Sequence, residues 1–556
     1  MIDIIENEKP RLIQTGRGFS VLYRNKYLYS KYNPQQAMAA QVSALECADS
    51  MLVLCFSPVL GYGLQELSQR LSASSAILAV ECDQLLMRFS LENAAPACFT
   101  DERFFYIRTD SVSEVMKKIE SLPAFPFKKC ISISCSGGVQ LYRTFYDTVR
   151  LYAGEVISRF WKNRITLMHL GRNYVHNTFR NLLSLADNCG VSMQCGAAAW
   201  DNNCRFRLLT DNDRIYKPVL VAGAGPSLDS ARDFLIKNRN AFFLLAVDAA
   251  AAALLPEIRP DAVVLVESQY WIDSAFIGFK KYGIPVFADI TASPRALRAC
   301  SGSISFFCTE YAQLRYLSSL YQALQPLILQ PLGSVGLTAV QLALTLAAPS
   351  LPVLHTGLDF AWQSGFTHAA GASPIKKLLA ETNRIESLYK LNVSADVRQI
   401  SGKQGASYRT TPVLTGYADL YRHIFAGNNR LIDIGRVGCS LTACSPVGQA
   451  EAEKLLTDAY KRFADTETDF EALRCRGDRQ TVQTYLTGEA ESLTALTGHL
   501  QGKCRLSDDA LEQLLAEQDY LYSHFPDAVR GYSLNLGFLK RISIEAAYIL
   551  KLIGSR

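Results

Sequence analysis

PVLVAGAGPSLDS, residues 218–230, is the stretch that decides the fold predicted for this chain. An apolar run over residues 219–222 leads into a turn made of Gly223, Ala224, Gly225, Pro226 and Ser227. We expect a strand, a tight turn and a helix here, because glycine allows a sharp bend and proline suits the first helical position. The N–H groups at the start of such a helix would face an anion such as a phosphate. A purely structural turn shows the same pattern, so the rest of the chain must decide between the two.

The composition is that of an ordinary globular protein. The chain has 556 residues, 49% of them hydrophobic and 20% charged, with a formal net charge of +5. This length predicts roughly two to four domains, and so small a positive excess does not indicate a nucleic-acid partner. Fifteen cysteines without CxxC spacing favour free thiols in a reducing compartment. Because neither a secretory signal nor an apolar segment of membrane-spanning length is present, we expect a cytoplasmic protein with no membrane span.

The first part of the chain has the pattern of a small α/β domain. Apolar runs at 51–56 and 76–83 flank an amphipathic segment, and further strands are expected at 103–109 and 128–136. Glu81 and Asp83 end the second run, where an acidic residue can hold a ribose in nucleotide-binding sheets. The loop before that run has only Gly61 and Gly63 and lacks a full phosphate turn, so a structural role for the two acids is favoured.

Strand-like runs repeat downstream of the opening stretch. They cover 241–248, 262–268, 283–290, 304–309 and 351–360. Nearly continuous apolar strands between helices predict a parallel sheet covered on both faces, and ligands of such sheets bind beyond the carboxyl ends of the strands. The polar or glycine residues that end these runs are Asp248, Glu267, Ser268, Asp289, Thr291, Gly357 and Asp359. Each alone could be a turn residue, but their shared placement favours a binding edge.

Two later segments add candidate site residues. A second glycine turn, Gly333-Ser334-Val335-Gly336, precedes an apolar helix and offers either another anion-binding helix start or close packing on the sheet. The loop after the last strong strand carries Trp362 and His368. His368 lies at the predicted binding edge, where an imidazole can donate to a phosphate or exchange a proton. His355, by contrast, lies inside an apolar strand and is expected in the core.

The remaining sequence is helical, apart from one more predicted strand. We expect a helix over 407–425, a last strand within 429–441, and helices from residue 446 onward. The predicted fold class is therefore α/β, with Rossmann-like parallel sheet domains and a helical C-terminal region. The predicted boundaries are 1–160 for an N-terminal Rossmann-like α/β domain, 161–215 for a helical connector, 216–445 for the sheet domain that begins with the opening stretch, and 446–556 for a helical domain. No HExxH, P-loop or GxSxG motif is present, so neither a histidine metal site nor those chemistries are expected.

Four segments in order resemble the motility-associated-factor glycosyltransferases, bacterial proteins linked to modification of flagellin with nonulosonic (sialic-acid-like) sugars. These segments are AGAGPSLD (222–229), LLAVDAAAAALL with RPDAVVLVES (244–268), GSVGLTAVQLALTLA (333–347) and GLDFAWQSGFTHAAG (357–371). The first domain is similar to that family through LYSKYNPQQAMA (28–39), LGYGLQEL (60–67) and AVECD (79–83). The same core resembles bacterial sialyltransferases that use a CMP donor, which implies a sialyltransferase-like nucleotide-sugar-binding domain over 216–445. Less strongly, it resembles MptE-like 6-hydroxymethylpterin diphosphokinases.

The resemblance implies a role for each matching position. Donor-binding residues would be Gly223, Ala224, Gly225, Pro226, Ser227, Asp248, Glu267, Ser268, Gly333, Ser334, Val335, Gly357, Asp359 and Trp362. His368 stands where sialyltransferases carry a tyrosine directed toward the leaving phosphate. Their base histidine falls in a segment that holds Tyr408 and Arg409 here, and Tyr408 is the catalytic candidate of that segment.

The implied function is transfer of a nonulosonic acid from its CMP donor to serine or threonine of flagellin, with no cofactor and no metal. The alternatives are pyrophosphoryl transfer from ATP by a diphosphokinase-like site, which would need Mg²⁺, and a non-catalytic motility or assembly factor. A Rossmann dehydrogenase is disfavoured, because Ser227-Leu228 stands where the third glycine of its fingerprint belongs.

Overall fold

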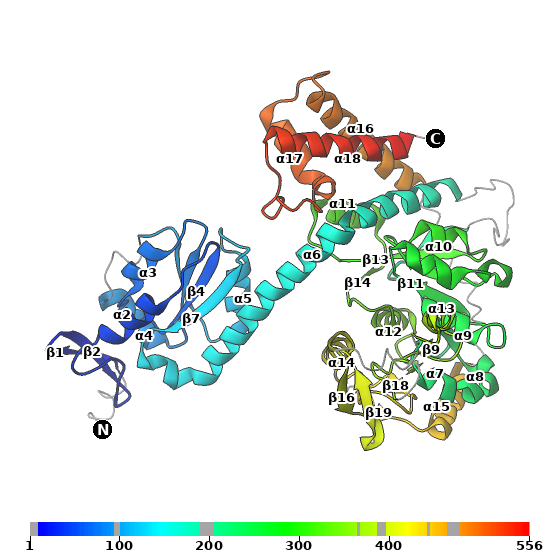
Figure 1. Cartoon of the computed structure of the whole chain (residues 1–556), viewed down its shortest axis with the longest axis horizontal. Helices are drawn as coiled ribbons and strands as arrows, with labels where there is room; N and C mark the ends of the chain where they lie inside the picture. Colours follow the sequence, from blue (N-terminus) through cyan, green and yellow to red (C-terminus); the bar gives the residue numbers. More distant parts are fainter. Residues whose placement is uncertain are drawn as a thin grey trace. The chain divides into compact units, whose positions relative to one another are not determined.

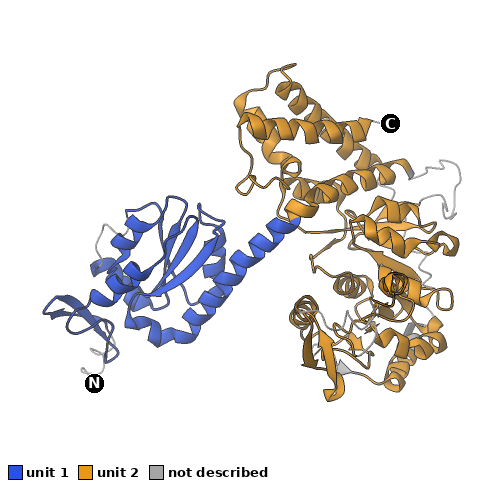
Figure 2. Cartoon of the chain, in the orientation of Figure 1, with its two compact units in different colours: residues 1–166 blue, residues 167–556 orange. Residues whose placement is uncertain are grey.

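The computed structural model describes residues 9–93, 100–188, 205–363, 367–385, 396–441, 445–463 and 479–554 (Figure 1). The chain divides into two compact units, residues 1–166 and 167–556 (Figure 2). One long helix, α6 (Arg143–Asn188), runs through the boundary between them. Its first part packs in the core of unit 1 through Tyr146 and Val149, and its last part packs in the core of unit 2 through Phe179 and Leu182.

Unit 1 is built on a parallel sheet with strand order β6-β5-β4-β7. The strands are β4 (Met51–Phe56), β5 (Ala76–Glu81), β6 (Phe104–Arg108) and β7 (Lys129–Ser134). The helices are α2 (Gln36–Ala44), α3 (Leu64–Arg70), α4 (Gln84–Asn93), α5 (Val112–Glu120) and the 3-10 helix η2 (Gly137–Tyr142). Even-numbered residues of β4 enter one core cluster and odd-numbered residues enter another, which is why this apolar strand is buried on both faces. An antiparallel sheet precedes them, made of β1 (Arg11–Thr15), β2 (Gly18–Tyr23) and β3 (Lys26–Tyr27).

Unit 2 contains a ten-stranded parallel sheet in the order β14-β13-β12-β11-β10-β9-β15-β18-β19, with β8 also pairing with β13. The strands are β8 (Phe206–Leu208), β9 (Val219–Ala222), β10 (Phe243–Val247), β11 (Ala262–Leu265), β12 (Val286–Asp289), β13 (Ile304–Thr309), β14 (Ile328–Leu329), β15 (Val353–Thr356), β18 (Leu431–Asp433) and β19 (Ser445–Pro446). The predicted α/β fold class with parallel sheets and a helical C-terminal region is confirmed.

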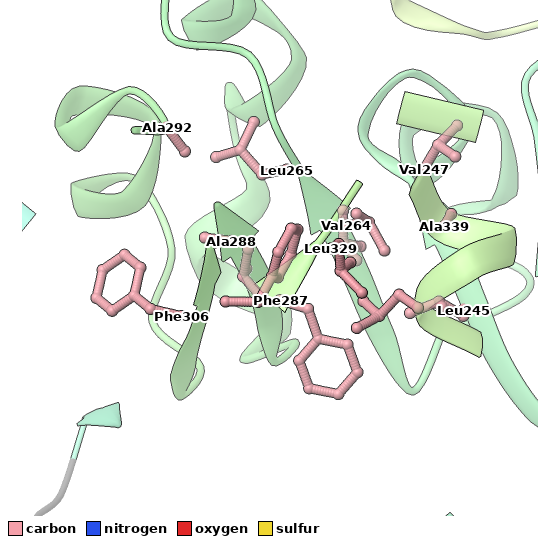
Figure 3. Packing of buried hydrophobic residues seen from close by; sticks show 14 of the residues in the cluster. Leu245, Val247, Val264, Leu265, Phe287, Ala288, Ala292, Phe306, Leu329 and Ala339 are labelled. Atoms are coloured by element: carbon pink, nitrogen blue, oxygen red, sulfur yellow. The ribbon is translucent and has the colours of Figure 1, made fainter. Parts of the chain in front are cut away.

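Short helices connect the strands of unit 2. They are α7 (Ser227–Ser230), α8 (Arg232–Lys237), α9 (Asp248–Leu254), α10 (Pro294–Arg298), α11 (Arg315–Leu324), α12 (Val335–Leu346), α13 (Ser373–Glu381) and α14 (Pro412–Ile424), with 3-10 helices η3 (Arg239–Ala241), η4 (Tyr270–Phe276), η5 (Phe279–Tyr282) and η7 (Lys403–Gly405). Figure 3 shows side chains of β10, β11 and β12 in one buried cluster, with Ala339 of α12 beside Leu245 and Val247 of β10. Burial of strand side chains against one another and against helices stabilises this unit.

The C-terminal region is helical, as expected. It contains α15 (Gln449–Phe463), α16 (Arg479–Leu500), α17 (Asp508–Glu517), the 3-10 helix η9 (Asp519–Leu521) and α18 (Leu536–Gly554). Leu493 of α16 and Ile542 of α18 belong to the same core cluster as the strands of unit 2. Among the helices described here, none is both long and apolar enough to cross a membrane.

One predicted element is wrong in part. The expected helix over 407–425 begins only at Pro412, and residues before it form the hairpin of β16 (Arg398–Ser401) and β17 (Ser407–Thr410). The Thr411 side chain accepts a hydrogen bond from the Leu414 N–H and caps the helix, and Pro412 occupies its first turn. Proline also disfavours a helical conformation in the residue before it, which places the boundary at Thr411.

Candidate functional site

The order of the strands places a topological switch point beside the opening stretch. From β9 the chain proceeds through β10 to β14 on one side, and it then returns to place β15 on the other side of β9. Ligands of open parallel sheets bind at such a switch point, outside the carboxyl ends of the strands. The residues after β9 are 223–227, and those after β15 are 357–362. The fold therefore brings two of the predicted site segments together.

These two segments approach through their backbones. The Gly223 N–H donates to the Thr356 oxygen over 2.8 Å, and the Gly225 N–H donates to the Gly357 oxygen over 2.8 Å. A Cβ atom on Gly223 would lie 2.3 Å from the Gly357 oxygen, a distance that side chains do not tolerate. Glycine is therefore needed here for close packing of strand ends, and two of the amides expected to face a phosphate are already bonded within the chain.

Asp359 occupies the start of α7. Its Oδ2 accepts a hydrogen bond of 2.7 Å from the Ser227 N–H, while the Ser227 hydroxyl oxygen accepts one of 2.7 Å from the Gly357 N–H. Asp359 is only 2% exposed, and its Oδ1 has no hydrogen-bond partner in the described part of the chain. Burial raises the pKa of this carboxyl to about 6, against the opposing effect of the Ser227 hydrogen bond. A ligand bound at this turn would lie beside the Asp359 carboxyl group, which changes its protonation state near its pKa of about 6.

A buried lysine lies behind Asp359. Lys403 Nζ is 2.5 Å from Asp433 Oδ2 and donates to the Gly435 oxygen over 2.8 Å. The positive charge lowers the pKa of Asp359, although less than burial raises it. Sequence reasoning missed both partners of this ion pair. Asp433 ends β18 and could have been found by the rule that identified the other strand-end residues, whereas Lys403 comes from a loop without any periodic signal.

His355 is in the core, as predicted. It lies in β15 with its Nε2 2.7 Å from the Tyr421 hydroxyl and its Nδ1 3.8 Å from Asp433 Oδ1. Burial lowers the pKa of His355 to about 4, so the imidazole is neutral at neutral pH.

The loop that carries His368 packs on the glycine turn. The Ala369 N–H donates to the Ala224 oxygen and the Ala370 N–H donates to Asp229 Oδ2, each over 2.8 Å. His368 Nδ1 is 2.9 Å from the Thr367 hydroxyl, and partial burial lowers the pKa of the imidazole. His368 therefore lies beside the turn and is mainly neutral at pH 7. Residues 364–366 of the matched segment fall outside the described ranges.

Two aromatic candidates are buried in packing. Trp362 is 3% exposed, and its backbone forms a bridge with Arg409 of β17. Tyr408 is also 3% exposed, and a Cβ on Gly402 would lie 2.5 Å from its ring. The β16–β17 hairpin thus lies against the segment after β15. The Tyr408 ring, however, packs on Gly402 in the turn of the same hairpin.

The second glycine turn also reaches the switch point. Ser334 precedes α12, Val335 begins it, and the Gly333 oxygen accepts a 2.7 Å hydrogen bond from the Tyr417 hydroxyl. A Cβ on Gly336 would lie 2.6 Å from Leu358, the residue that follows Gly357. The start of α12 therefore packs on the same strand end as the first turn.

Acidic residues follow the neighbouring strands. Asp248 begins α9, is buried, and accepts a 2.6 Å hydrogen bond from the Ala249 N–H. Burial and, to a lesser extent, the charge of Glu267 raise the pKa of Asp248 to about 7. Asp289 is engaged by Thr291 and by the Thr309 hydroxyl, so it stabilises the turn after β12. Within the described ranges, no group of three His, Cys, Asp or Glu side chains is placed to hold a metal ion.

The chain is similar to known proteins along most of its length. Residues 200–365 match the family model described as 6-hydroxymethylpterin diphosphokinase MptE-like. A solved structure of an MAf glycosyltransferase from Magnetospirillum magneticum AMB-1 superposes with a TM-score of 0.58 at 12% identity, covering 98% of this chain and 91% of that one. The resemblance to motility-associated-factor glycosyltransferases predicted this domain and this fold, and it is confirmed for both.

A particular relative is much closer in sequence. An uncharacterized protein of Treponema pallidum (strain Nichols) is 38% identical in an alignment of length 565, gaps included, that covers 98% of this chain and 95% of that protein. The chain belongs to the same family as this treponemal protein.

Proposed function

We propose that the protein is a glycosyltransferase that moves a nonulosonic acid from a CMP donor to serine or threonine hydroxyls of flagellin. The observation that carries the proposal is the meeting of four separate segments at the β9–β15 switch point. They are 223–227, 333–336, 357–359 and 367–370, joined by backbone hydrogen bonds and, for 333–336, by the packing of Gly336 on the Leu358 side chain. The fold shared with the Magnetospirillum glycosyltransferase supports the reaction class.

The reaction exchanges one bond for another at the anomeric carbon of the sugar. The bond from this carbon to the phosphate oxygen of CMP breaks, the bond to the acceptor oxygen forms, and the hydroxyl proton leaves. Negative charge develops on the phosphate of departing CMP, where hydrogen-bond donors lower the barrier. His368 would donate from its Nε2–H, because the Thr367 hydroxyl can supply the proton that its Nδ1 accepts. Asp359, with a pKa raised to about 6, is suited to take up the acceptor proton.

The proposal is tested with the full chain, a CMP-linked nonulosonic acid and purified flagellin, by intact-protein mass spectrometry. We expect a mass increase of one sugar residue per modified site, and His368→Ala should reduce its rate by about 100-fold or more. His423→Ala is the matched control, since His423 is exposed on α14. The proposed function would be excluded if purified flagellin gained no mass in the reaction and flagellin from a deletion strain had the same mass as flagellin from the parent strain.

A second function is favoured by the MptE-like match over residues 200–365. Pyrophosphoryl transfer from ATP would require Mg²⁺ on carboxylates, for which Asp248, Glu267 and Asp359 are the candidates. Calorimetry separates the two functions: CMP binding without metal supports the glycosyltransferase, and binding of ATP only with Mg²⁺ supports the diphosphokinase. If Gly225→Trp abolished nucleotide binding but left flagellin modification in cells intact, the protein would be a non-catalytic motility factor.

A further inference from the structure

The segment that follows β11 exposes large apolar side chains. Tyr270 is 71% exposed and Trp271 is 50% exposed at the start of η4, and their ring centroids lie 5.5 Å apart. Ile277, the residue after η4, is 83% exposed. Single exposed apolar residues are common on protein surfaces, but a group of large ones on one short segment indicates a site of interaction.

Buried rings hold Ile277 in its exposed position. Phe276 and Phe279 lie on either side of it in the sequence and are 1% and 4% exposed, and their ring centroids lie 5.1 Å apart. Gly278 has a φ of +74°, a left-handed conformation that turns the chain at this point. The Ile277 N–H also donates to the Ser274 oxygen over 3.4 Å. The isoleucine is therefore an apolar tip on a packed base.

Four exposed cations accompany these apolar side chains. Lys280 and Lys281 follow in η5, and Arg295 and Arg298 lie on α10, which packs on η4. Tyr270 of η4 and the two arginines of α10 also line one cavity of about 450 Å³. Aromatic rings and cations thus share one part of the surface. We call Tyr270, Trp271, Ile277, Lys280 and Lys281 the η4–η5 surface.

Few negative charges balance these cations. Asp273 is the single acidic residue between positions 269 and 283, and α10 has none. Asp273 Oδ1 accepts a 2.9 Å hydrogen bond from the Ser293 hydroxyl, which joins the start of α10 to η4. Four exposed cations and one acid leave a net positive charge, so the η4–η5 surface suits a partner with negative charge.

The residue types favour a lipid bilayer over a protein as this partner. Tryptophan and tyrosine rings prefer the interface between lipid and water, because one end of each ring is apolar and the other carries a polar atom. Each lysine close to an anionic bilayer strengthens binding about five-fold. Interfaces between proteins, by contrast, are depleted in lysine. A lysine pair next to exposed aromatic and aliphatic side chains is thus typical of a surface that binds anionic lipid.

We propose that the η4–η5 surface, with the two arginines of α10 beside it, binds a bilayer that contains anionic phospholipids. Trp271 and Ile277 enter the interfacial region, and the cations contact the headgroup phosphates. Because η4 follows the carboxyl end of β11, docking holds this edge of the sheet close to the bilayer. The inference requires neither a CMP donor nor a flagellin acceptor, so it can hold if the proposed function fails.

The test is flotation of the full chain with vesicles. The vesicles are made of phosphatidylcholine alone or of phosphatidylcholine with about one third phosphatidylglycerol, which is anionic. We expect binding at least ten-fold tighter to the anionic vesicles at about 0.1 M salt, and loss of most of this binding at about 1 M, where the Debye length is only about 3 Å. Tryptophan fluorescence should shift to shorter wavelength on binding, and Trp271→Phe should abolish the shift.

Two variants separate the charges from the apolar tip. Lys280→Gln combined with Lys281→Gln should weaken binding to the anionic vesicles at least ten-fold, because two cations leave the surface. Ile277→Ser should weaken it about ten-fold, because a side chain that enters the bilayer loses its apolar surface. Both changes are at exposed positions, so unchanged unfolding temperatures are expected.

The matched controls are Lys128→Gln combined with Lys129→Gln, and Ile385→Ser. Both lysines are exposed in unit 1, and Ile385 is 89% exposed in unit 2 outside the η4–η5 surface, so these variants should bind vesicles like the wild type.

Four outcomes would overturn the inference. Failure to float with either kind of vesicle would exclude the bilayer, and equal binding to both kinds would remove the role of the cations. Wild-type binding by the lysine variant and by Ile277→Ser would place the contact elsewhere in the chain. If poly-glutamate bound the wild type as tightly as the anionic vesicles did and both variants lost this binding, the partner would be an acidic protein.

Discussion

Replacing Gly223 by alanine tests the backbone contact on which the switch-point site depends. The new Cβ would lie 2.3 Å from the Gly357 oxygen, 2.6 Å from the Gly357 carbonyl carbon and 2.6 Å from Leu358 Cδ2. Ordinary contacts of this kind begin at about 3.5 Å, so the overlap is about 1 Å and two of the three atoms are backbone. Because the two contacted atoms of Gly357 belong to the backbone, no side-chain rotation can relieve the overlap, and the ends of β9 and β15 must move apart.

The expected cost follows from this overlap. Overpacking a core costs about 1–3 kcal/mol, and a clash with backbone in the centre of a sheet belongs at the upper end or above it. We expect Gly223→Ala to lower the free energy of unfolding by about 3 kcal/mol or more. Gly357→Ala should be at least as costly, because its Cβ would lie 2.1 Å from the Gly223 oxygen and its φ is +72°.

The assay is urea denaturation of the full chain, followed by far-UV circular dichroism. Gly416→Ala is the matched control, since Gly416 is exposed in α14 of the same unit and a Cβ there meets nothing within 4 Å. This control should stabilise unit 2 by about 0.5–1 kcal/mol, because glycine weakens helices relative to alanine. If Gly223→Ala changed the free energy of unfolding by less than about 0.5 kcal/mol, the typical effect of a surface substitution, the reasoning would be refuted.

Two further predictions concern buried charges, and a third concerns the imidazole of His368. The folded pKa of Asp248 is raised from 3.8 to about 7, so the contribution of this carboxyl to stability is fully present at pH values below 3.8 and is lost as pH rises toward 7. Asp248→Asn should remove this loss, gaining about 4 kcal/mol on the wild type between pH 4 and pH 8, whereas identical pH dependence in denaturation curves would contradict it. Lys403→Met leaves the Asp433 carboxylate buried and unpaired, and should cost about 3–5 kcal/mol that a second change, Asp433→Asn, largely restores. If Lys403→Met were as stable as the double variant, an unpaired Asp433 carboxylate would not be the cause of the lost stability, and the prediction would be wrong. Because neutral His368 keeps its Nε2–H, kcat should stay level as pH rises above the lowered pKa of the imidazole. A pH-rate profile in which kcat falls through that pKa, and in which His368→Gln shows no such fall, would mean instead that the imidazolium transfers a proton.

Much of the fold could be predicted because parallel strands buried on both faces appear as continuous apolar runs. The run 304–309 matches β13, and 51–56 matches β4. The hairpin that contains Tyr408 was missed, because its alternating residues precede a strong helix and no apolar run marks it. For the candidate site, the strand-end rule identified Asp248 and Asp359, but it could not show that their carboxyl groups are buried.

The sequence by itself determined that 218–230 forms a strand and a tight turn, since glycine spacing and apolar runs act locally. Only the tertiary structure decided what the turn contacts. The strand order placed Gly357 and Asp359 against Gly223 and Ser227, more than a hundred residues apart in the chain. It also gathered arginines of α6 and α10 around one pocket. The physical reason is that close approach, burial and shifted pKa values arise between segments, and a linear pattern records only the preferences of each segment alone.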